Sequence, residues 1–272
     1  MVRKLVAVCV ISWLPLLQGM PHAKPITVSA AVSLTDALTA VAAEYGRRGM
    51  GSVRFNFGAS NVLARQIVAG APVDVFLSAD DAQMDVVAQA GLLKDGSRVA
   101  VLRNQLAIVV PSDRPRTFHG VRDISDPSIR RIAIGDPAAV PAGVYAKQYL
   151  QKEGLWDALS ARIVPTGSVR AALAAVESGA ADAAIVYRTD ARIALRATVA
   201  WVVPADSGPR IVYPAAIIRT TTAPDQAGRF LDFVRSYPAA QIFERFGFQA
   251  VSASSPRPAL KNPQSGAAAQ AR

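Results

Sequence analysis

The stretch from Ile26 to Phe57 reads ITVSAAVSLTDALTAVAAEYGRRGMGSVRFNF, and it decides the fold class. Ile26 to Ala30 is a short run rich in β-branched residues, which is typical of a buried strand. Apolar residues then recur at helical spacing from about Leu34 to Tyr45, and a second strand-like run follows at Val53 to Phe57. A strand, a helix and a strand in this order indicate a parallel strand pair joined by a crossover helix.

The same alternation continues along the chain, with no internal repeat at a fixed period. Further strands are expected at Val73 to Ala79, Ala107 to Pro111, Arg131 to Asp136 and Ala183 to Tyr187, and near the end in WVVP and IVYPAAII. Further helices are expected at about Val62 to Ala69, Val144 to Lys152, Val169 to Ser178 and Asp225 to Phe243. This pattern predicts an α/β fold with mostly parallel sheets that are flanked by helices on both faces.

The two ends of the chain differ in composition from the rest. Residues 1–23 have a basic start, an apolar run from Leu5 to Leu17 and a candidate cleavage site near Ala23, which predicts an export signal peptide. Residues 252–272 are mainly Pro, Ser, Ala and Gln, which predicts a disordered tail. The chain of 272 residues, 51% of them hydrophobic, is long enough for one large domain or two smaller ones.

Cysteine, histidine and charge exclude several classes of protein. Cys9 is the only cysteine and lies in the expected signal, which excludes a disulfide or a thiolate nucleophile in the processed protein. His22 lies beside the expected cleavage site, so His119 alone remains, and a His-dependent enzyme is hard to build. Five of the 30 Lys and Arg residues lie in the two ends, with none of the 20 acidic ones, so the remaining net charge is +5 of the total +10. A net charge of +5 with scattered arginines is a mildly basic surface, which does not indicate nucleic-acid binding.

Small and hydroxyl residues gather at the turns that lead from strands into helices. Ser33 precedes a helix and has Asp36 three residues later, which is the spacing of a capping box, and Ser60 is placed as another N-cap. The segment DPAAVPAGVYAKQYL brings Ala142 to a helix start directly after Pro141. PTGSVRAAL brings Val169 to the start of a further helix.

These turns have two interpretations. Each serine or proline taken singly is explained by helix capping alone. Taken together, the turns offer a cage for an anion, because the first N–H groups of a helix have no internal partner and attract negative charge. In open α/β sheets such turns converge outside the carboxyl ends of the strands.

Five segments, in this order and at suitable spacing, resemble the periplasmic molybdate-binding proteins that serve ABC importers. The resemblance extends from about Ile26 to Phe248. The segments are AAVSLTDAL, GASNVLARQIVAGAPVDVFLSAD, GDPAAVPAGVYAKQYL, VRAALAAVESGAADAAIVYRTDA and ERFGF.

The resemblance implies a periplasmic-binding-protein fold of two α/β lobes joined by two crossing segments. Lobe one would comprise residues 24–104 and 209–251, and lobe two residues 105–208, with the ligand held between them. It also implies a monomer in the periplasm that passes its ligand to a membrane permease. Neither enzymatic activity nor a cofactor is expected.

In that family a tetrahedral oxyanion is bound without a counter-charge, and the implied ligand here is molybdate or tungstate. Carried over motif by motif, the contacts are the hydroxyls and amides of Ser33 and Ser60, the backbone amides of Ala142 and Val169, and the hydroxyl of Tyr187. A site made only of donors would disfavour a protonated oxyanion, which brings a donor of its own.

Other functions remain open at this point. Sulfate is a second candidate ligand. Hydrogen phosphate carries a proton that needs a hydrogen-bond acceptor, and none of the five positions supplies one. A hydrolase built on Ser33 or Ser60 would need a base and an orienting acid. A receptor for a larger organic ligand would need a pocket lined by aromatic residues. Only 7% of the residues are aromatic, which argues against such a receptor.

The charged residues near these motifs have plain structural interpretations. Arg65, Arg170 and Arg188 are expected to be solvated or to support the two lobes rather than to contact the anion. Asp74 and Asp80 are expected to cap the next helix rather than to bind a metal.

Overall fold

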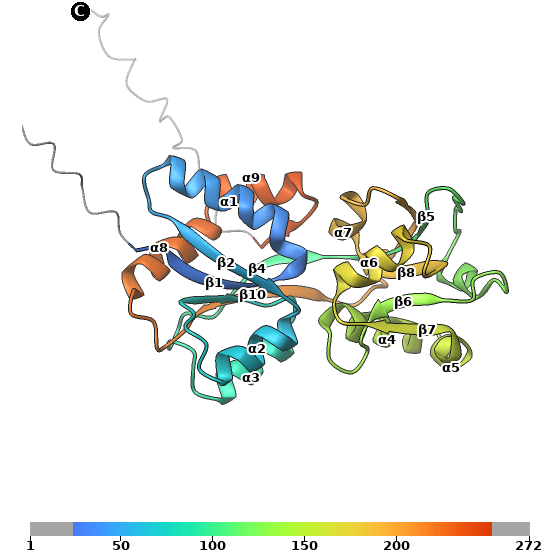
Figure 1. The fold of residues 1–272 in the computed structure, drawn as a ribbon, viewed down its shortest axis with the longest axis horizontal. Helices are drawn as coiled ribbons and strands as arrows, with labels where there is room; N and C mark the ends of the chain where they lie inside the picture. Colours follow the sequence, from blue (N-terminus) through green and yellow to red (C-terminus); the bar gives the residue numbers. More distant parts are fainter. Residues whose placement is uncertain (1–23, 252–272) are drawn as a thin grey trace, which may run out of the picture.

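The computed structural model describes residues 24–251, so the expected signal peptide and tail lie outside the described residues. Two separate sheets lie side by side, each with helices on both faces, which confirms the two-lobed α/β fold (Figure 1). None of the helices within residues 24–251 is both long and apolar enough to span a membrane.

The first sheet contains the stretch that decides the fold. Strand β1 pairs in parallel with β2, with Ile26 opposite Val53, as the strand–helix–strand pattern predicts. Along the sheet the strand order is β11-β4-β10-β3-β1-β2. The strands are β1 (Ile26–Ala31), β2 (Val53–Gly58), β3 (Val75–Leu77), β4 (Val99–Asn104), β10 (Ile211–Ile217) and β11 (Gln249–Ala250).

Two groups of helices cover the first sheet. Helices α1 (Thr35–Arg47), α8 (Pro224–Val234) and α9 (Tyr237–Arg245) lie on one face, and α2 (Ser60–Val68) and α3 (Asp81–Gln89) lie on the other (Figure 1). A short 3-10 helix, Val32–Leu34, leads from β1 into α1. Leu38, Phe230 and Phe243 are fully buried in the core between α1, α8, α9 and the sheet.

The second sheet has the strand order β7-β6-β8-β5-β9. Its strands are β5 (Leu106–Pro111), β6 (Ile132–Gly135), β7 (Ile163–Thr166), β8 (Ala183–Tyr187) and β9 (Ala197–Val202). Helix α4 (Pro141–Lys152) packs on β6 and β8, with α5 (Trp156–Leu159) beside it. Helix α6 (Val169–Glu177) packs on β6 and β8 from the other face, next to α7 (Arg188–Arg192) (Figure 1). Two 3-10 helices, Val121–Ser125 and Ser160–Arg162, complete this half.

Both sheets are mixed, where the strand–helix alternation led us to expect mostly parallel sheets. In the first sheet β10 runs antiparallel to β3 and β4, and in the second sheet β5 runs antiparallel to β8 and β9. The parallel pairs are those joined through helices, such as β6 with β7 and with β8. The antiparallel pairs of β5 and β10 arise because these two strands enter their sheets directly from the other lobe, without a crossover helix.

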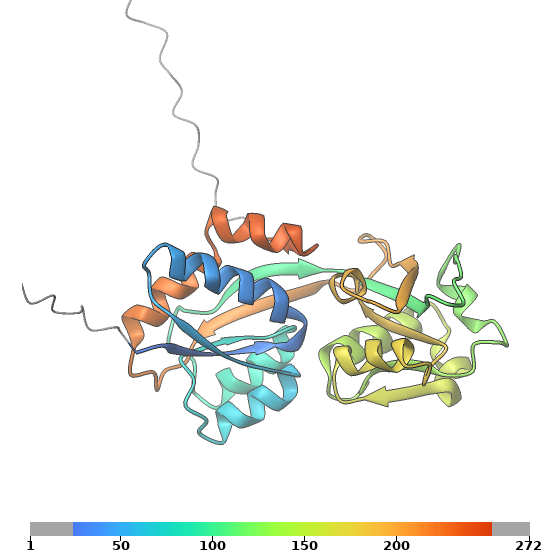
Figure 2. The same cartoon turned by 45° about the horizontal axis from the view of Figure 1, so that its top comes forward.

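The chain passes between the two sheets twice. It leaves the first sheet at Asn104, and Gln105 alone separates β4 from β5. It returns between Val202, the end of β9, and Ile211, the start of β10. Figure 2 shows the green and orange crossing strands side by side between the lobes. On this basis we propose residues 24–104 with 209–251 and residues 105–208 as the two lobes.

The expectation of one last helix from Asp225 to Phe243 was wrong. The segment forms two helices, α8 and α9, with a break at Arg235 and Ser236. Pro238 explains the break, because in a continuous helix it would donate no N–H to Val234 and its ring would clash with that carbonyl. In α9 it lies in the first turn, where no N–H is needed.

Candidate functional site

The five residues expected to bind the anion border one small cavity between the two lobes. Its volume is about 10 Å³, close to the space of one water molecule. Each of the five is at most 4% exposed. The cavity is lined by Ala31, Val32, Ser33, Gly58, Ala59, Ser60, Ala79, Val140, Pro141, Ala142, Val169 and Tyr187. A pocket for a larger organic ligand would be far bigger, so the geometry favours a small ion.

Two helix starts from lobe two point at this cavity. Ala142 is the second residue of α4, and Val169 is the first residue of α6. The N–H groups at these positions have no carbonyl partner within their own helices. They are therefore free to donate to an anion, and the positive ends of both helix dipoles favour negative charge there.

Glycine allows the start of α4 to lie against the end of β6. A Cβ atom on Gly143 would overlap the carbonyl oxygen of Gly135. A Cβ atom on Gly135 would lie 2.6 Å from Cγ1 of Val140. The two glycines thus permit a close backbone approach, and this approach brings the N–H of Ala142 to the cavity.

Tyr187 presents a buried hydroxyl to the cavity. It is the last residue of β8 and is 1% exposed. Within residues 24–251 its hydroxyl has no hydrogen-bond partner. Burial raises the pKa of Tyr187 well above its usual value, so the phenol stays a donor. A buried polar group without a partner is costly in a folded protein, so this hydroxyl is a candidate contact for a ligand.

The two serines bind the framework instead of capping helices, so the expected caps at Ser33 and Ser60 were wrong. Ser33 lies in the 3-10 helix before α1, whose N-cap is Leu34, and its Oγ lies 3.1 Å from the hydroxyl of Tyr213. Ser60 is the first residue of α2, one position beyond the N-cap, and its Oγ accepts from the N–H of Ala79 at 3.0 Å.

The expected caps at Asp80 and Asp74 have different outcomes, and a further cap is found at Ser168. Ser168 caps α6 and accepts from the N–H of Ala171 at 3.1 Å. Asp80 caps α3 and accepts from the N–H of Gln83 at 3.0 Å, as expected. Asp74 does not cap a helix: its carboxylate accepts from the N–H of Thr27 at 2.7 Å and from the hydroxyl of Thr221.

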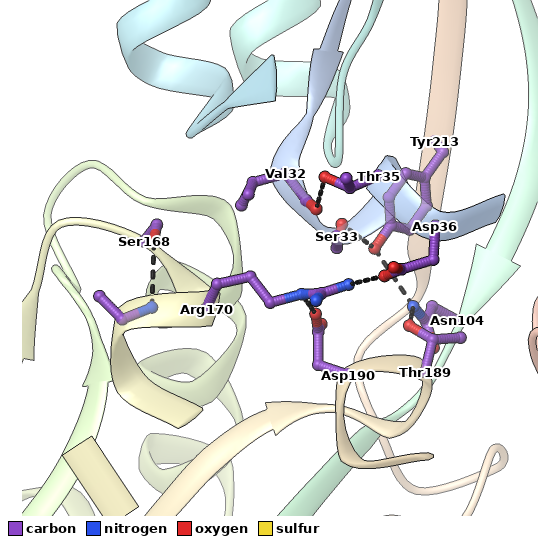
Figure 3. A network of polar contacts seen from close by, with 11 residues as sticks. Val32, Ser33, Thr35, Asp36, Asn104, Ser168, Arg170, Thr189, Asp190 and Tyr213 are labelled. Atoms are coloured by element: carbon purple, nitrogen blue, oxygen red, sulfur yellow. Dashed lines mark hydrogen bonds and ion pairs between the residues drawn. The ribbon is translucent and has the colours of Figure 1, made fainter. Parts of the chain in front are cut away.

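No charged side chain of residues 24–251 borders the cavity. Arg170 instead forms ion pairs with Asp36 of α1, at 2.7 Å, and with Asp190 of α7 (Figure 3). It therefore supports the contact between the lobes, as the sequence suggested. Arg188 donates to the side chain of Gln105 at 3.0 Å, and Arg65 is exposed. In the described part of the chain, His, Cys, Asp and Glu form no cluster suited to a metal ion.

The sequence reasoning missed two polar residues behind Ser33, namely Tyr213 and Asn104. Tyr213 lies in β10 with 0% exposure, and Asn104 ends β4 with 8% exposure. Figure 3 shows them joined to Ser33 and to Thr189 by hydrogen bonds. The available signal was the tyrosine in the apolar run IVYPAAII, since a buried tyrosine hydroxyl needs a partner.

Comparison with known proteins is consistent with this geometry. The family model for bacterial extracellular solute-binding proteins matches residues 26–249. The molybdate-binding protein ModA of Escherichia coli (strain K12) is 38% identical over 228 residues, which cover 82% of this chain and 88% of that protein. ModA of Haemophilus influenzae is 34% identical, over 83% of this chain and 90% of that protein. The structure of the Azotobacter vinelandii periplasmic molybdate-binding protein has a TM-score of 0.74 and 28% identity, over 82% of this chain and 98% of that one.

Proposed function

Because the chain belongs to the bacterial extracellular solute-binding protein family, we propose that it binds molybdate between its two lobes and delivers it to an ABC importer. The similarity to the molybdate-binding proteins of E. coli and H. influenzae supports the choice of ligand. The observation that carries the proposal is the buried hydroxyl of Tyr187, which borders the cavity and has no partner among residues 24–251.

The arrangement binds a dianion through neutral donors. The N–H groups of Ala142 and Val169 would contact it from lobe two, together with the hydroxyl of Tyr187. Ser33 and Ser60 would contact it from lobe one. Fixed dipoles would replace the water shell of the anion, and hydrogen bonds to a charged group are stronger than neutral ones.

The hydroxyl of Ser60 is placed to donate its proton. The Oγ of Ser60 already accepts from the N–H of Ala79 at 3.0 Å, so its own hydroxyl proton is free to point into the cavity. A shell of donors favours a fully deprotonated oxyanion and disfavours hydrogen phosphate. Tungstate closely matches molybdate in size and charge, so we include it in the proposal, and sulfate remains the alternative ligand.

The same residues argue against catalysis at this site. A serine nucleophile needs a neighbouring base, and neither Ser33 nor Ser60 has a histidine as a hydrogen-bond partner in the described structure. His119 is exposed and does not border the cavity. We therefore propose an exported, monomeric binding protein of the periplasm, with a membrane permease as its partner and no enzymatic activity.

Titration calorimetry of the purified protein with molybdate, tungstate, sulfate and phosphate tests the proposal. We expect molybdate and tungstate to bind with a Kd at or below about 1 µM, and sulfate to bind at least about 100-fold more weakly. Tight sulfate binding with weak molybdate binding would instead establish the alternative ligand. No binding of any of the four anions would overturn the proposal.

A further inference from the structure

A chain of hydrogen bonds leads from the crossing segment to Ser33. The side-chain nitrogen of Asn104 lies 2.8 Å from the hydroxyl of Thr189 and 3.2 Å from the hydroxyl of Tyr213. The hydroxyl of Tyr213 lies 3.1 Å from Oγ of Ser33. Figure 3 shows these four side chains in sequence, next to the ion pairs of Arg170.

The direction of each hydrogen bond follows from the orientation of the Asn104 amide. The side-chain oxygen of Asn104 accepts from the backbone N–H of Gln105 at 2.9 Å. Because a backbone N–H can only donate, this contact fixes which end of the amide is oxygen. The two protons of the amide nitrogen are thus given to Thr189 and Tyr213.

In the arrangement that leaves no proton of this chain of hydrogen bonds unpaired, the hydroxyl of Tyr213 donates to Ser33. It accepts from Asn104 and carries one proton, and within residues 24–251 its only other partner is Oγ of Ser33. Burial raises the pKa of Tyr213, so the phenol keeps this proton. With its Oγ accepting from Tyr213, Ser33 has its own proton left for the cavity that it borders.

We propose that Tyr213, oriented by Asn104, is a positioning residue that holds the Ser33 hydroxyl as a donor and so sets the selectivity of the site for unprotonated oxyanions. Tyr213 does not border the cavity and acts through Ser33. Donation along the chain also strengthens the last bond, because consecutive hydrogen bonds polarise one another. The inference rests on the proposed function, since it assigns a role within the same anion site.

The test compares Tyr213→Phe with the wild type and with a matched control, Tyr149→Phe. The first change removes only the hydroxyl and keeps the ring that packs against Phe248 and Tyr187. The control removes the hydroxyl of another buried tyrosine, which lies on α4 beside Trp201. For each protein the Kd of molybdate and, by competition, the constants of sulfate and hydrogen phosphate are measured at mildly alkaline pH. Sulfate and hydrogen phosphate have the same charge there and differ by one proton.

We expect Tyr213→Phe to weaken molybdate and sulfate binding about tenfold. Binding of hydrogen phosphate should weaken less or improve, because Ser33 can then accept the proton of that ligand. Tyr149→Phe should keep the wild-type constants. Melting temperatures without ligand identify any general loss of structure.

Two results would overturn the inference. One is a molybdate Kd in Tyr213→Phe equal to that of Tyr149→Phe. The other is an equal loss of affinity for all three anions, which would mean a merely structural role. Failure of the proposed function is distinct, because the wild type itself would then not bind molybdate.

Discussion

The hydroxyl of Tyr187 offers the most direct test of the site at the scale of a single residue. Tyr187→Phe should weaken molybdate binding by roughly 1.5–3 kcal/mol, because a hydrogen bond to a charged ligand is lost. The ligand-free protein should keep its melting temperature or gain slightly, since the hydroxyl has no partner within residues 24–251. Calorimetry and thermal melting measure the two effects. Unchanged affinity for molybdate would remove Tyr187 from the site.

Asp190 gives a prediction about pH. It is fully buried, and burial raises its pKa to about 6 in spite of the ion pair with Arg170. In an unfolded chain an aspartate titrates near ~3.9, so the folded protein holds this proton more tightly. The contribution of Asp190 to stability is therefore fully present below pH ~3.9 and is lost as the pH rises through the folded-state value.

Denaturant unfolding of the wild type and of Asp190→Asn over a pH series checks this sign. The unfolding free energy of the wild type should fall relative to that of Asp190→Asn as the pH rises from about 4 to about 6. The difference should then stay constant at higher pH. Parallel curves across that interval would show that Asp190 does not titrate with a raised pKa.

The start of helix α4 is tested at the scale of an element. Ala142→Pro removes the N–H expected to contact the anion, while the first turn of a helix tolerates proline. Affinity for molybdate should fall at least about tenfold, or about 1.4 kcal/mol, with an apo melting temperature within a few degrees of wild type. Ala142→Ser keeps the N–H and should bind nearly normally. Wild-type affinity in a folded Ala142→Pro variant would mean that this helix start serves only to begin α4.

Most elements follow from local patterns, and the errors have local causes. AAIVY was expected as a strand and is β8, because a run this short with β-branched residues favours a strand over a helix. The helix expected across Asp225 to Phe243 breaks because of Pro238, which the apolar spacing alone does not register. The antiparallel neighbours of β5 and β10 depend on where the chain changes lobe, and periodicity contains no such information.

In the candidate site, residues in recognisable local segments could be predicted from the sequence, whereas those defined by distant contacts could not. Ser33, Ser60, Ala142, Val169 and Tyr187 each lie in a recognisable segment, and the structure brings all five to one cavity. Tyr213 was missed because its partner, Ser33, is 180 residues away along the chain. The same distance explains why Ser33 was taken for a helix cap, which needs only neighbours in sequence.

At the scale of the whole molecule, the ion pair between Arg170 and Asp36 joins the two lobes. Asp36→Asn should weaken molybdate binding by about two- to fivefold, because a partly exposed ion pair contributes up to about 1 kcal/mol. The loss should shrink at high salt, which screens the pair. Calorimetry at low and high ionic strength measures both effects.

The matched control is Asp81→Asn, which removes a contact of Asp81 with Arg98 within lobe one. This change should leave the affinity for molybdate unchanged, since Asp81 and Arg98 lie in the same lobe and their contact is the same whether or not a ligand is bound. Tighter binding in Asp36→Asn would contradict the expectation, because it would show that the carboxylate acts on the anion only by repulsion.

The joint of one residue between β4 and β5 also bears on the orientation of the Ser33 hydroxyl before a ligand binds. Gln105 accepts from the N–H of Arg188 and donates to the carbonyl of Val203, so the joint between the lobes is short and braced. If the lobes open about this short joint, we expect the smallest displacements close to it, where Asn104 lies. We expect opening to break the ion pair between Arg170 and Asp36, which lie in different lobes, whereas Asn104 and Tyr213 lie on neighbouring strands of one sheet and stay together. In the open protein Ser33 would then already direct its proton toward the site, and the arriving anion would meet a donor that needs no reordering.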